Sequence, residues 1–285
     1  MIYERVQVPS SDGAMINMDV YVPDPCWRTK VNVRRPAIVI CPGGGYRFCS
    51  EREAEPIALR FAMEGFNTFV VWYRVALRGE DEAMGDCYAS SPDHKFPMPQ
   101  HDAAACLAYV RANADKYMTN PDRIAIMGFS AGGHLAASVS GLWQNAELWQ
   151  PLGLKPEDVR PNAAVLCYPV IVADKDAHRG SFEHLSGSEN VEEHQQYSIL
   201  NWVTENYPPT FLWHTFTDGA VPVQNSIRMA HALAEKNVLT ELHIFPNGPH
   251  GLSLCNDATA VVPEEVQPDC ECWAGMAARF LHNAM

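Results

Sequence analysis

Short apolar runs alternate with longer helical stretches along most of this 285-residue chain, and this alternation limits the folds open to it. The apolar runs have the character of strands, several of them continuous enough to be buried on both faces of a sheet, and lie at residues 37–40, 68–73, 123–129, 163–168, 211–216 and 241–245. The helical stretches lie at residues 53–64, 102–116, 131–141, 223–236 and 273–283, and Asp102 is expected to cap the second of them. Because strands that alternate with helices form parallel sheets covered on both faces, the sequence predicts an α/β fold.

The remaining segments complete the predicted organisation. Residues 3–8 and 15–22 alternate polar and apolar side chains around a turn, which predicts a hairpin. Residues 78–99, punctuated by glycines and prolines, are expected to form a loop, and the polar segment 171–209 could form a small lid. Since the chain contains no internal repeat, low-complexity tract or linker, we expect residues 1–285 to form a single domain.

A motif typical of a nucleophilic serine lies between a predicted strand and a predicted helix. Residues 128–132 read Gly-Phe-Ser-Ala-Gly and match G-x-S-x-G. In this setting Ser130 is held in a strained backbone conformation at a sharp turn, and the glycines remove side chains that would collide. The alternative is a turn whose serine only caps the helix. Ser188 also lies beside a glycine, but no predicted strand precedes it, and we expect a turn there.

Three consecutive glycines, residues 43–45, directly follow the first central strand. In acyl transfer, backbone N–H groups must point at the carbonyl oxygen as it becomes an oxyanion, and glycines let the backbone approach closely. We therefore assign the oxyanion hole to the N–H groups of Gly44, Gly45 and Ala131. The run lacks the patterns of a phosphate-binding loop, and a plain flexible turn is the remaining alternative.

His250 is the histidine best placed to act as a base. It follows a predicted strand in a loop with glycines close by, from which it could reach a neighbouring loop. His214 and His243 lie inside predicted strands, where packing is the expected role. His134, one helical turn after Ser130, is interpreted as structural.

Asp218 is the candidate acid, at the end of the predicted strand 211–216. An acid there could orient the imidazole and stabilise its protonated form. A lone Asp-Gly pair is often only a turn, but the chain order Ser130, Asp218, His250 is the order that accompanies the G-x-S-x-G motif. Asp174 is the second choice for the acid and Asp176 the third.

These motifs together resemble the α/β-hydrolase superfamily, and specifically its esterase branch with a glycine-rich oxyanion loop. The sequence is similar to bacterial esterases described as acetylxylan esterase-like or xylanase-associated. The stretches that carry the resemblance span most of the chain in the expected order: Pro42-Gly43-Gly44-Gly45-Tyr46, Gly128-Phe129-Ser130-Ala131-Gly132-Gly133-His134, Thr217-Asp218 and Pro249-His250-Gly251.

One departure narrows the resemblance. The hormone-sensitive-lipase-like group has His-Gly-Gly-Gly where this chain has Pro42, and it carries a larger N-terminal cap. Both differences favour small sugar-ester esterases with an open site. The resemblance to the superfamily itself implies the α/β-hydrolase fold, with a central, mostly parallel sheet flanked by helices.

The resemblance implies two-step acyl transfer through an acyl-enzyme on Ser130, with His250 as the base and no metal or organic cofactor required. It implies a small-molecule or oligosaccharide ester as substrate, with acetyl groups on xylan or xylo-oligosaccharides favoured. Tyr46 is assigned to substrate binding. Tyr46, Trp72 and Trp202 could form a sugar platform, although aromatic residues of this kind are more often part of the core.

Other functions stay open at this point. A peptidase or arylformamidase would use the same triad, although peptidases of this fold usually carry an additional large domain. A catalytically silent binding protein would have no need to keep all three groups. A lipase would need a more apolar lid than residues 171–209 offer.

The net charge and the cysteines narrow the partners and the compartment. A formal net charge of −13 argues against nucleic acid or an anionic membrane as a partner, because both need a positive surface. The N-terminus lacks signal-peptide features, so a cytoplasmic location is expected. The nine cysteines are interpreted as reduced thiols; Cys270 and Cys272, with Cys255 upstream, are too few ligands for a metal site.

Overall fold

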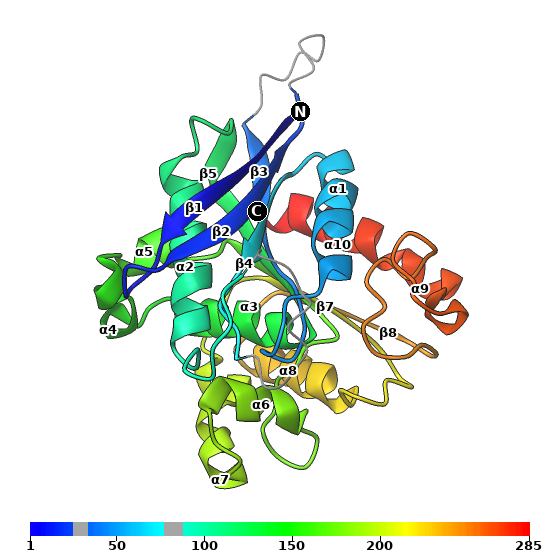
Figure 1. Cartoon of the computed structure of the whole chain (residues 1–285). Coiled ribbons are helices and arrows are strands. Elements are labelled where there is room, and N and C mark those ends of the chain that lie inside the picture. The colour runs from blue at the N-terminus through cyan, green and yellow to red at the C-terminus, as the bar shows by residue number, and fades with distance from the viewer. Residues whose placement is uncertain (25–33, 77–87) are drawn as a thin grey trace.

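The computed structural model describes residues 1–24, 34–76 and 88–285, and its centre is a single β-sheet (Figure 1). Within these residues eight strands pair in the order β1-β2-β4-β3-β5-β6-β7-β8. The strands are β1 (Ile2–Pro9), β2 (Met15–Val22), β3 (Arg35–Cys41), β4 (Asn67–Trp72), β5 (Thr119–Phe129), β6 (Ala163–Cys167), β7 (Thr210–Thr215) and β8 (Thr240–Phe245). Strands β3 to β8 run parallel, whereas β2 pairs antiparallel with both β1 and β4. The predicted α/β fold and the predicted hairpin are both confirmed.

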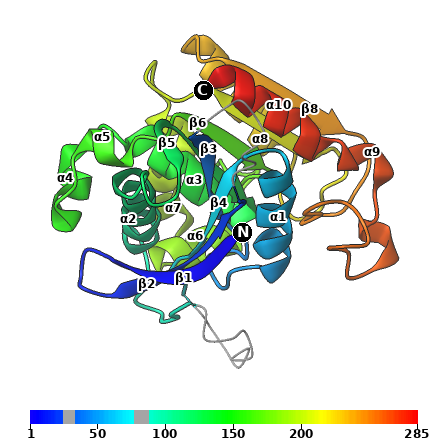
Figure 2. The ribbon, with the colours of Figure 1, turned by 90° about the horizontal axis from the view of Figure 1, so that it is seen from above.

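Helices cover both faces of the sheet. The longer ones are α1 (Glu55–Met63), α2 (Met98–Ala112), α3 (Ser130–Leu142), α8 (Gln224–Glu235) and α10 (Trp273–Ala284). The shorter ones are α4 (Ala146–Trp149), α5 (Pro156–Val159), α6 (Arg179–Ser186), α7 (Val191–His194) and α9 (Pro268–Glu271), with 3₁₀ turns η1 (Glu51–Glu53), η2 (Gln150–Leu152), η3 (Gln195–Tyr197), η4 (Ile199–Trp202) and η5 (Pro263–Glu265). Seen from above, α1 and α10 lie on one side of the sheet and α2 and α3 on the other (Figure 2).

The burial of the strands follows from this two-sided cover. Every residue of β4, β6 and β7 is buried, as continuous apolar runs predict for strands between two helical layers. The strand β8 ends the sheet and is mostly half-buried. The core is therefore centred on the middle strands, whose carboxyl ends meet at one edge.

One predicted helix begins earlier than expected. Asp102 was expected to cap a helix running to Lys116, but α2 begins at Met98 and ends at Ala112. Asp102 does not cap the helix, because its carboxylate is fully buried and accepts hydrogen bonds from the Arg74 guanidinium and from Ser10. Part of the loop predicted before this helix lies outside the described residues.

The segment predicted as a possible lid, residues 171–209, contains α6, α7, η3 and η4. Figure 1 shows α6 and α7 beyond the end of the sheet at which the parallel strands finish. Phe182 of α6 packs with Val170, Ala173 and Val221 in a small cluster separate from the main core. The segment is thus folded onto the domain through its own apolar contacts, and its role as a lid stays a prediction.

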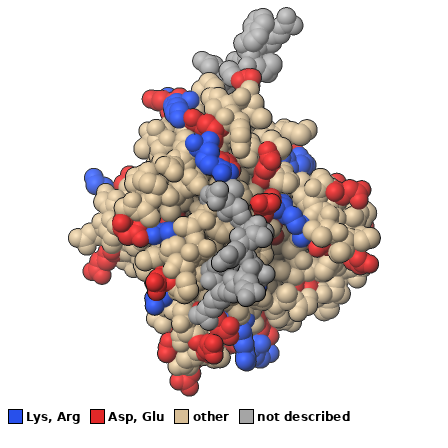
Figure 3. Space-filling view, viewed as in Figure 1, with Lys and Arg blue, Asp and Glu red and all other residues tan. Residues whose placement is uncertain are grey.

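On the face seen in Figure 3, acidic and basic side chains of the described residues are interspersed rather than segregated. None of the helices within the described ranges is long and apolar enough to cross a bilayer.

Candidate active site

Ser130 lies at the sharp turn between β5 and α3. Its backbone φ is 52°, a value that residues other than glycine rarely adopt. A Cβ on Gly128 would stand 2.0 Å from the carbonyl oxygen of Gly132, and a Cβ on Gly132 would stand 2.2 Å from that of Cys41. A Cβ on Gly133 would meet Pro169 at 2.8 Å. The prediction that these glycines remove colliding side chains around a strained serine is therefore confirmed.

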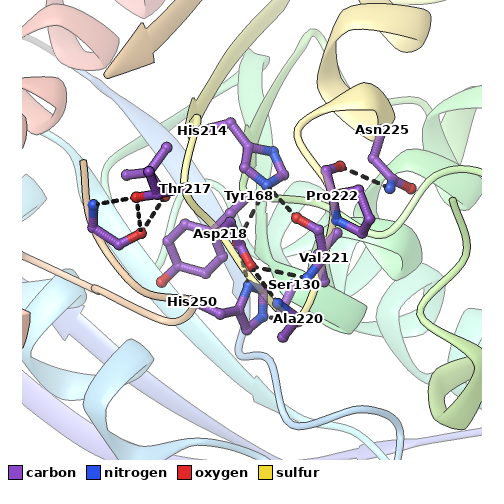
Figure 4. A network of polar contacts seen from close by, with 12 residues as sticks. Ser130, Tyr168, His214, Thr217, Asp218, Ala220, Val221, Pro222, Asn225 and His250 are labelled. Atoms are coloured by element: carbon purple, nitrogen blue, oxygen red, sulfur yellow. Dashed lines mark hydrogen bonds and ion pairs between the residues drawn. The ribbon is translucent and has the colours of Figure 1, made fainter. Parts of the chain in front are cut away.

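The loops after β5, β7 and β8 bring three side chains together at the carboxyl edge of the sheet (Figure 4). Ser130 Oγ lies 2.7 Å from Nε2 of His250, and Nδ1 of His250 lies 2.6 Å from Oδ2 of Asp218. The alternative acids Asp174 and Asp176 lie elsewhere and pair with Arg228. The structure thus brings together the serine, acid and histidine first chosen from the sequence.

Asp218 is held by donors on both carboxylate oxygens. Its Oδ1 accepts hydrogen bonds from the backbone N–H groups of Ala220 and Val221, each at 2.9 Å. Its Oδ2 lies 2.6 Å from His250 Nδ1 and 3.2 Å from Nε2 of the buried His214. Burial acts to raise the pKa of Asp218, but the hydrogen bonds from His214 and His250 outweigh it and hold that pKa well below its usual range. The acid is therefore ionised at neutral pH.

His214 was expected to be a packed strand residue, and it is, but it also has a second role that the sequence did not reveal. Its Nε2 faces two acceptors, Val221 O at 2.9 Å and Asp218, so Nε2 must carry the proton. Its Nδ1 lies 2.8 Å from the hydroxyl of Ser226. His214 is consequently a donor that helps to orient the acid from behind.

The glycine loop after β3 is shaped by backbone hydrogen bonds. Gly44 has a φ of 126°, and a Cβ there would stand 2.1 Å from Phe48 O, so only glycine fits. The carbonyl of Gly43 accepts from Ser50 N at 2.9 Å, and that of Gly44 accepts from Phe48 N at 3.1 Å. Because the C=O and N–H of a trans peptide point in opposite directions, these bonds turn the N–H groups of Gly44 and Gly45 away from residues 48–50.

Two of the predicted oxyanion donors have no acceptor within the part of the chain that the structure describes, namely the N–H groups of Gly44 and Gly45. Ala131 is in the first turn of α3, where N–H groups lack a partner within the helix. The carbonyl of Ser130, which shares a peptide with Ala131 N–H, is fixed by Val170 N at 3.0 Å. All three donors are thus oriented in advance by neighbouring backbone bonds.

The assignment of Tyr46 to substrate binding is wrong. Its side chain is 1% exposed, and its hydroxyl donates to Nδ1 of His134 at 2.8 Å, so the ring has no free face for a sugar. His134 is structural, as expected, since its Nε2 donates to Tyr197 O. Of the other two aromatic residues, Trp72 is also buried and Trp202 is half-buried.

Two residues at the site were missed from the sequence. The Glu53 carboxylate is buried beside the glycine loop, where its Oε2 accepts from Gly43 N at 2.7 Å. Its Oε1 accepts from the Tyr168 hydroxyl at 2.6 Å, and the Tyr168 ring packs edge-on against His250. The only signal for Glu53 was an acidic residue in a charged stretch, which is normally a solvated surface.

Six thiols among the described residues are free: Cys41, Cys106, Cys167, Cys255 and Cys270 are buried, and Cys272 is exposed. Within the same residues no group of three or more His, Cys, Asp or Glu side chains is arranged to hold a metal ion. Cys26 and Cys87 lie outside the described residues.

Comparison with known proteins gives a family match and curated relatives. The BD-FAE family model matches residues 18–233. The chain is 35% identical over 229 residues to endo-1,4-beta-xylanase B of Butyrivibrio fibrisolvens, covering 79% of this chain and 34% of the relative. It is 30% identical over 248 residues to an acetylxylan esterase of Xylanibacter ruminicola, covering 85% and 44%. The chain therefore spans only a third to less than half of the length of these relatives.

Solved structures match over nearly the whole chain. The acetyl ester-xyloside bifunctional hydrolase from Caldicellulosiruptor lactoaceticus is 33% identical with a TM-score of 0.73, covering 95% of this chain and 88% of that one. The carboxylesterase Cest-2923 from Lactobacillus plantarum is 26% identical with a TM-score of 0.82, covering 99% and 98%. The arrangement of strands and helices described above is thus shared with these hydrolases from end to end.

Proposed function

This chain belongs to the BD-FAE family, on the α/β-hydrolase fold that its sequence predicted, and from this premise we propose that it is a serine carboxylesterase. The proposed substrates are short-chain esters, chiefly acetyl esters, on carbohydrates such as acetylated xylan or xylo-oligosaccharides. The observation that carries the proposal is the continuous contact from Asp218 through His250 to Ser130, with distances of 2.6 and 2.7 Å. The acetylxylan esterase and the acetyl ester-xyloside hydrolase among the similar proteins support the acetyl class.

In the proposed reaction His250 Nε2 takes the proton of Ser130 as the serine oxygen attacks the ester carbonyl. The carbonyl oxygen becomes an oxyanion, which the N–H groups of Gly44, Gly45 and Ala131 stabilise. His250 returns its proton to the departing alcohol, and an acyl group remains on Ser130. Water then attacks this acyl-enzyme as His250 takes its proton, the bond between the acyl carbon and the serine oxygen breaks, and His250 returns the proton to Ser130 as the carboxylic acid leaves. Every proton transferred in the two steps passes through the imidazole of His250, so the proposed reaction requires no metal or organic cofactor.

The surroundings of Asp218 support its part in this scheme. A catalytic acid must stay ionised while the neighbouring imidazole gains a proton, and must hold that imidazole in one tautomer. The backbone donors of Ala220 and Val221, together with His214, keep the carboxylate charged and fixed even though it is mostly buried. Its low pKa therefore supports a role in stabilising the imidazolium rather than in accepting the proton.

The compartment is also part of the proposal. Six cysteines among the described residues are free thiols, which suits a reducing environment and supports a cytoplasmic reaction on short oligosaccharide esters.

The test is release of acetate from acetylated xylo-oligosaccharides, beside hydrolysis of p-nitrophenyl acetate, with wild type and Ser130→Ala. Both activities should depend on Ser130. If only p-nitrophenyl acetate is cleaved, the mechanism stands and the carbohydrate substrate is wrong. If wild type cleaves neither ester, a catalytically silent binding protein becomes the better reading of the fold.

A further inference from the structure

We propose that Glu53 is a positioning residue of this active site, whose buried carboxylate joins the oxyanion loop to the loop that carries His250. The inference rests on the proposed function, because it gives Glu53 a task in the reaction of Ser130. It names a residue that the reaction scheme does not use and that no sequence motif marks.

The two oxygens of Glu53 bind two distant parts of the chain. Glu53 ends the 3₁₀ turn η1, and its side chain is buried at 4% exposure. Its Oε2 accepts from the N–H of Gly43 at 2.7 Å, and its Oε1 accepts from the hydroxyl of Tyr168 at 2.6 Å. One carboxylate therefore spans the loop after β3 and the residue that follows β6.

The Gly43 end of this link lies against the nucleophile. A Cβ built on Gly43 would stand 3.1 Å from the Cβ of Ser130 and 2.6 Å from Glu53 Oε2. The carbonyl of Gly43 is held by Ser50 N, so both backbone polar groups of this glycine are fixed by residues 50–53. The next N–H along the chain belongs to Gly44, the first proposed oxyanion donor. Glu53 thus sets the position from which that donor is aimed.

The Tyr168 end lies against the base. The Tyr168 and His250 rings meet edge to face, with centroids 5.2 Å apart and an interplanar angle of 72° (Figure 4). The Tyr168 hydroxyl also accepts from Ser253 N at 2.9 Å, and the Ser253 hydroxyl donates to Arg52 O at 2.6 Å. The loop after His250 is therefore clamped to η1 on one side and to Tyr168 on the other, and Glu53 connects the two.

A carboxylate suits this position for a specific reason. Both of its partners donate, and only a carboxylate can accept on both oxygens without presenting a donor of its own. Burial holds the pKa of Glu53 above its ordinary value, although the bonds from Tyr168 and Gly43 and the nearby His250 and Arg52 act to lower it. Two other groups also face it, the buried Tyr73 and Cys167, whose own pKa values are raised by burial. These neighbours therefore stay neutral and add no charge of their own.

The first test is Glu53→Gln, assayed with p-nitrophenyl acetate. The amide keeps the size of the side chain but presents an NH₂ to one of the two donors, which displaces the oxyanion loop or Tyr168. We expect kcat to fall at least about tenfold with KM within about twofold of wild type, because positioning acts on the transition state. The matched control is Asp102→Asn, another fully buried carboxylate with two partners, which contacts Arg74 and Ser10 and should keep the wild-type kcat at a temperature where the variant is folded.

A second pair of variants removes one buried tyrosine hydroxyl each. Tyr168→Phe breaks the bond to Glu53 and should lower kcat, whereas Tyr207→Phe breaks a bond to Ala137 O, two turns into α3 from Ser130, and should not. Because Glu53 and Tyr168 act through one contact, the double variant should lose less than the product of the two single losses. If Glu53→Gln fails to fold, the comparison of Tyr168→Phe with Tyr207→Phe still tests whether Glu53 has a positioning role.

The outcomes separate the two proposals. If folded Glu53→Gln and Tyr168→Phe keep the wild-type kcat while Ser130→Ala is inactive, the positioning role is wrong and the proposed function stands. A raised KM with unchanged kcat would assign Glu53 to substrate binding and also overturn the inference. If Ser130→Ala keeps full activity, the proposed function is wrong and the role of Glu53 falls with it.

Discussion

At the scale of single residues, the site depends on how each buried polar group is paired. Asp218 is mostly buried yet ionised, because four donors surround its two oxygens. His134 is fully buried and neutral, because each ring nitrogen has one partner that suits the uncharged tautomer. One rule thus explains why the first side chain is charged and the second is neutral: burial disfavours the charged form unless hydrogen bonds stabilise it.

The acid gives the first prediction. Asp218→Asn keeps the size of the side chain but removes the charge and presents an NH₂ group to the imidazole or to the backbone donors. We expect kcat to fall roughly a thousand- to ten-thousand-fold with the fold intact, as for the acid of other serine triads. Asp174→Asn is the control, since Asp174 pairs with Arg228 away from Ser130 and should leave kcat within about twofold. Equal losses in both variants would contradict the assignment of the acid.

His134 gives a prediction on stability and pH. Burial lowers its pKa to about 4, although the bond to Tyr197 O acts the other way. In the unfolded chain the pKa is about 6.5, so between these values only the unfolded state binds the proton. The free energy of unfolding should therefore be fully retained above pH 6.5 and decrease as the pH falls towards 4, by roughly 2–3 kcal/mol from this residue.

The measurement compares wild type with His134→Gln, which does not titrate, by urea unfolding at pH 7 and pH 4.5. The advantage of wild type over the variant should shrink by roughly 2 kcal/mol or more at the lower pH. The same difference at both pH values would show that His134 is not buried as a neutral group.

Residues identified from the sequence share one property, which is that a local pattern surrounds each of them. Ser130 has its glycines, and Asp218 and His250 follow strands in the expected chain order. Glu53 has no such pattern, because its partners are contributed by distant segments of the chain. Tyr46 was misjudged for the same reason: whether an aromatic ring faces solvent or core depends on partners such as His134, 88 residues away.

At the scale of elements, the turn from β5 into α3 is the most tightly packed feature of the site. A Cβ on Gly132 would stand 2.2 Å from Cys41 O and 2.3 Å from Pro42 O, so the start of α3 contacts the end of β3 through bare backbone. This contact also explains why the oxyanion loop and the serine lie side by side. The strand and helix around the motif were predictable from periodicity, whereas the start of α2 was not, because Asp102 looked like a cap in the sequence but its carboxylate pairs with the distant Arg74.

Gly132→Ala should damage both activity and stability. The added methyl forces α3 away from β3, which costs about 1–3 kcal/mol and displaces Ser130 and Ala131 together. A shift of about 1 Å in such groups lowers the rate roughly a hundredfold. Gly275→Ala in α10 is the matched control, because the nearest atom to its added Cβ is Arg60 Nη2 at 3.9 Å. We expect that variant to keep kcat and to gain up to about 1 kcal/mol, measured by urea unfolding beside Gly132→Ala.

At the scale of the whole molecule, the N-terminal hairpin is joined to the parallel sheet by a buried ion pair. Arg74, just after β4, contacts the Asp102 carboxylate in α2 at 2.8 Å, and Ser10 at the hairpin turn bonds to both. The side chains of Arg74 and Asp102 are 3% and 0% exposed. Three elements distant in sequence, β1, β4 and α2, thus meet at one charged contact remote from the triad.

This contact gives the last prediction. Removing one partner of a buried ion pair leaves the other charge without compensation, which costs about 3–5 kcal/mol, whereas a half-exposed pair is worth about 1 kcal/mol or less. Arg74→Met should therefore lose several kcal/mol in urea unfolding, and Arg228→Met, whose pair with Asp174 is over a third exposed on both sides, should lose little. Both variants should keep kcat at temperatures where they are folded. If Asp102→Asn is added to Arg74→Met, the double variant should recover part of the loss, because no buried charge is then left unpaired; Asp12, the other partner of Arg74, is 43% exposed. A further loss would mean that the hairpin is held by the shape of these side chains and not by their charge.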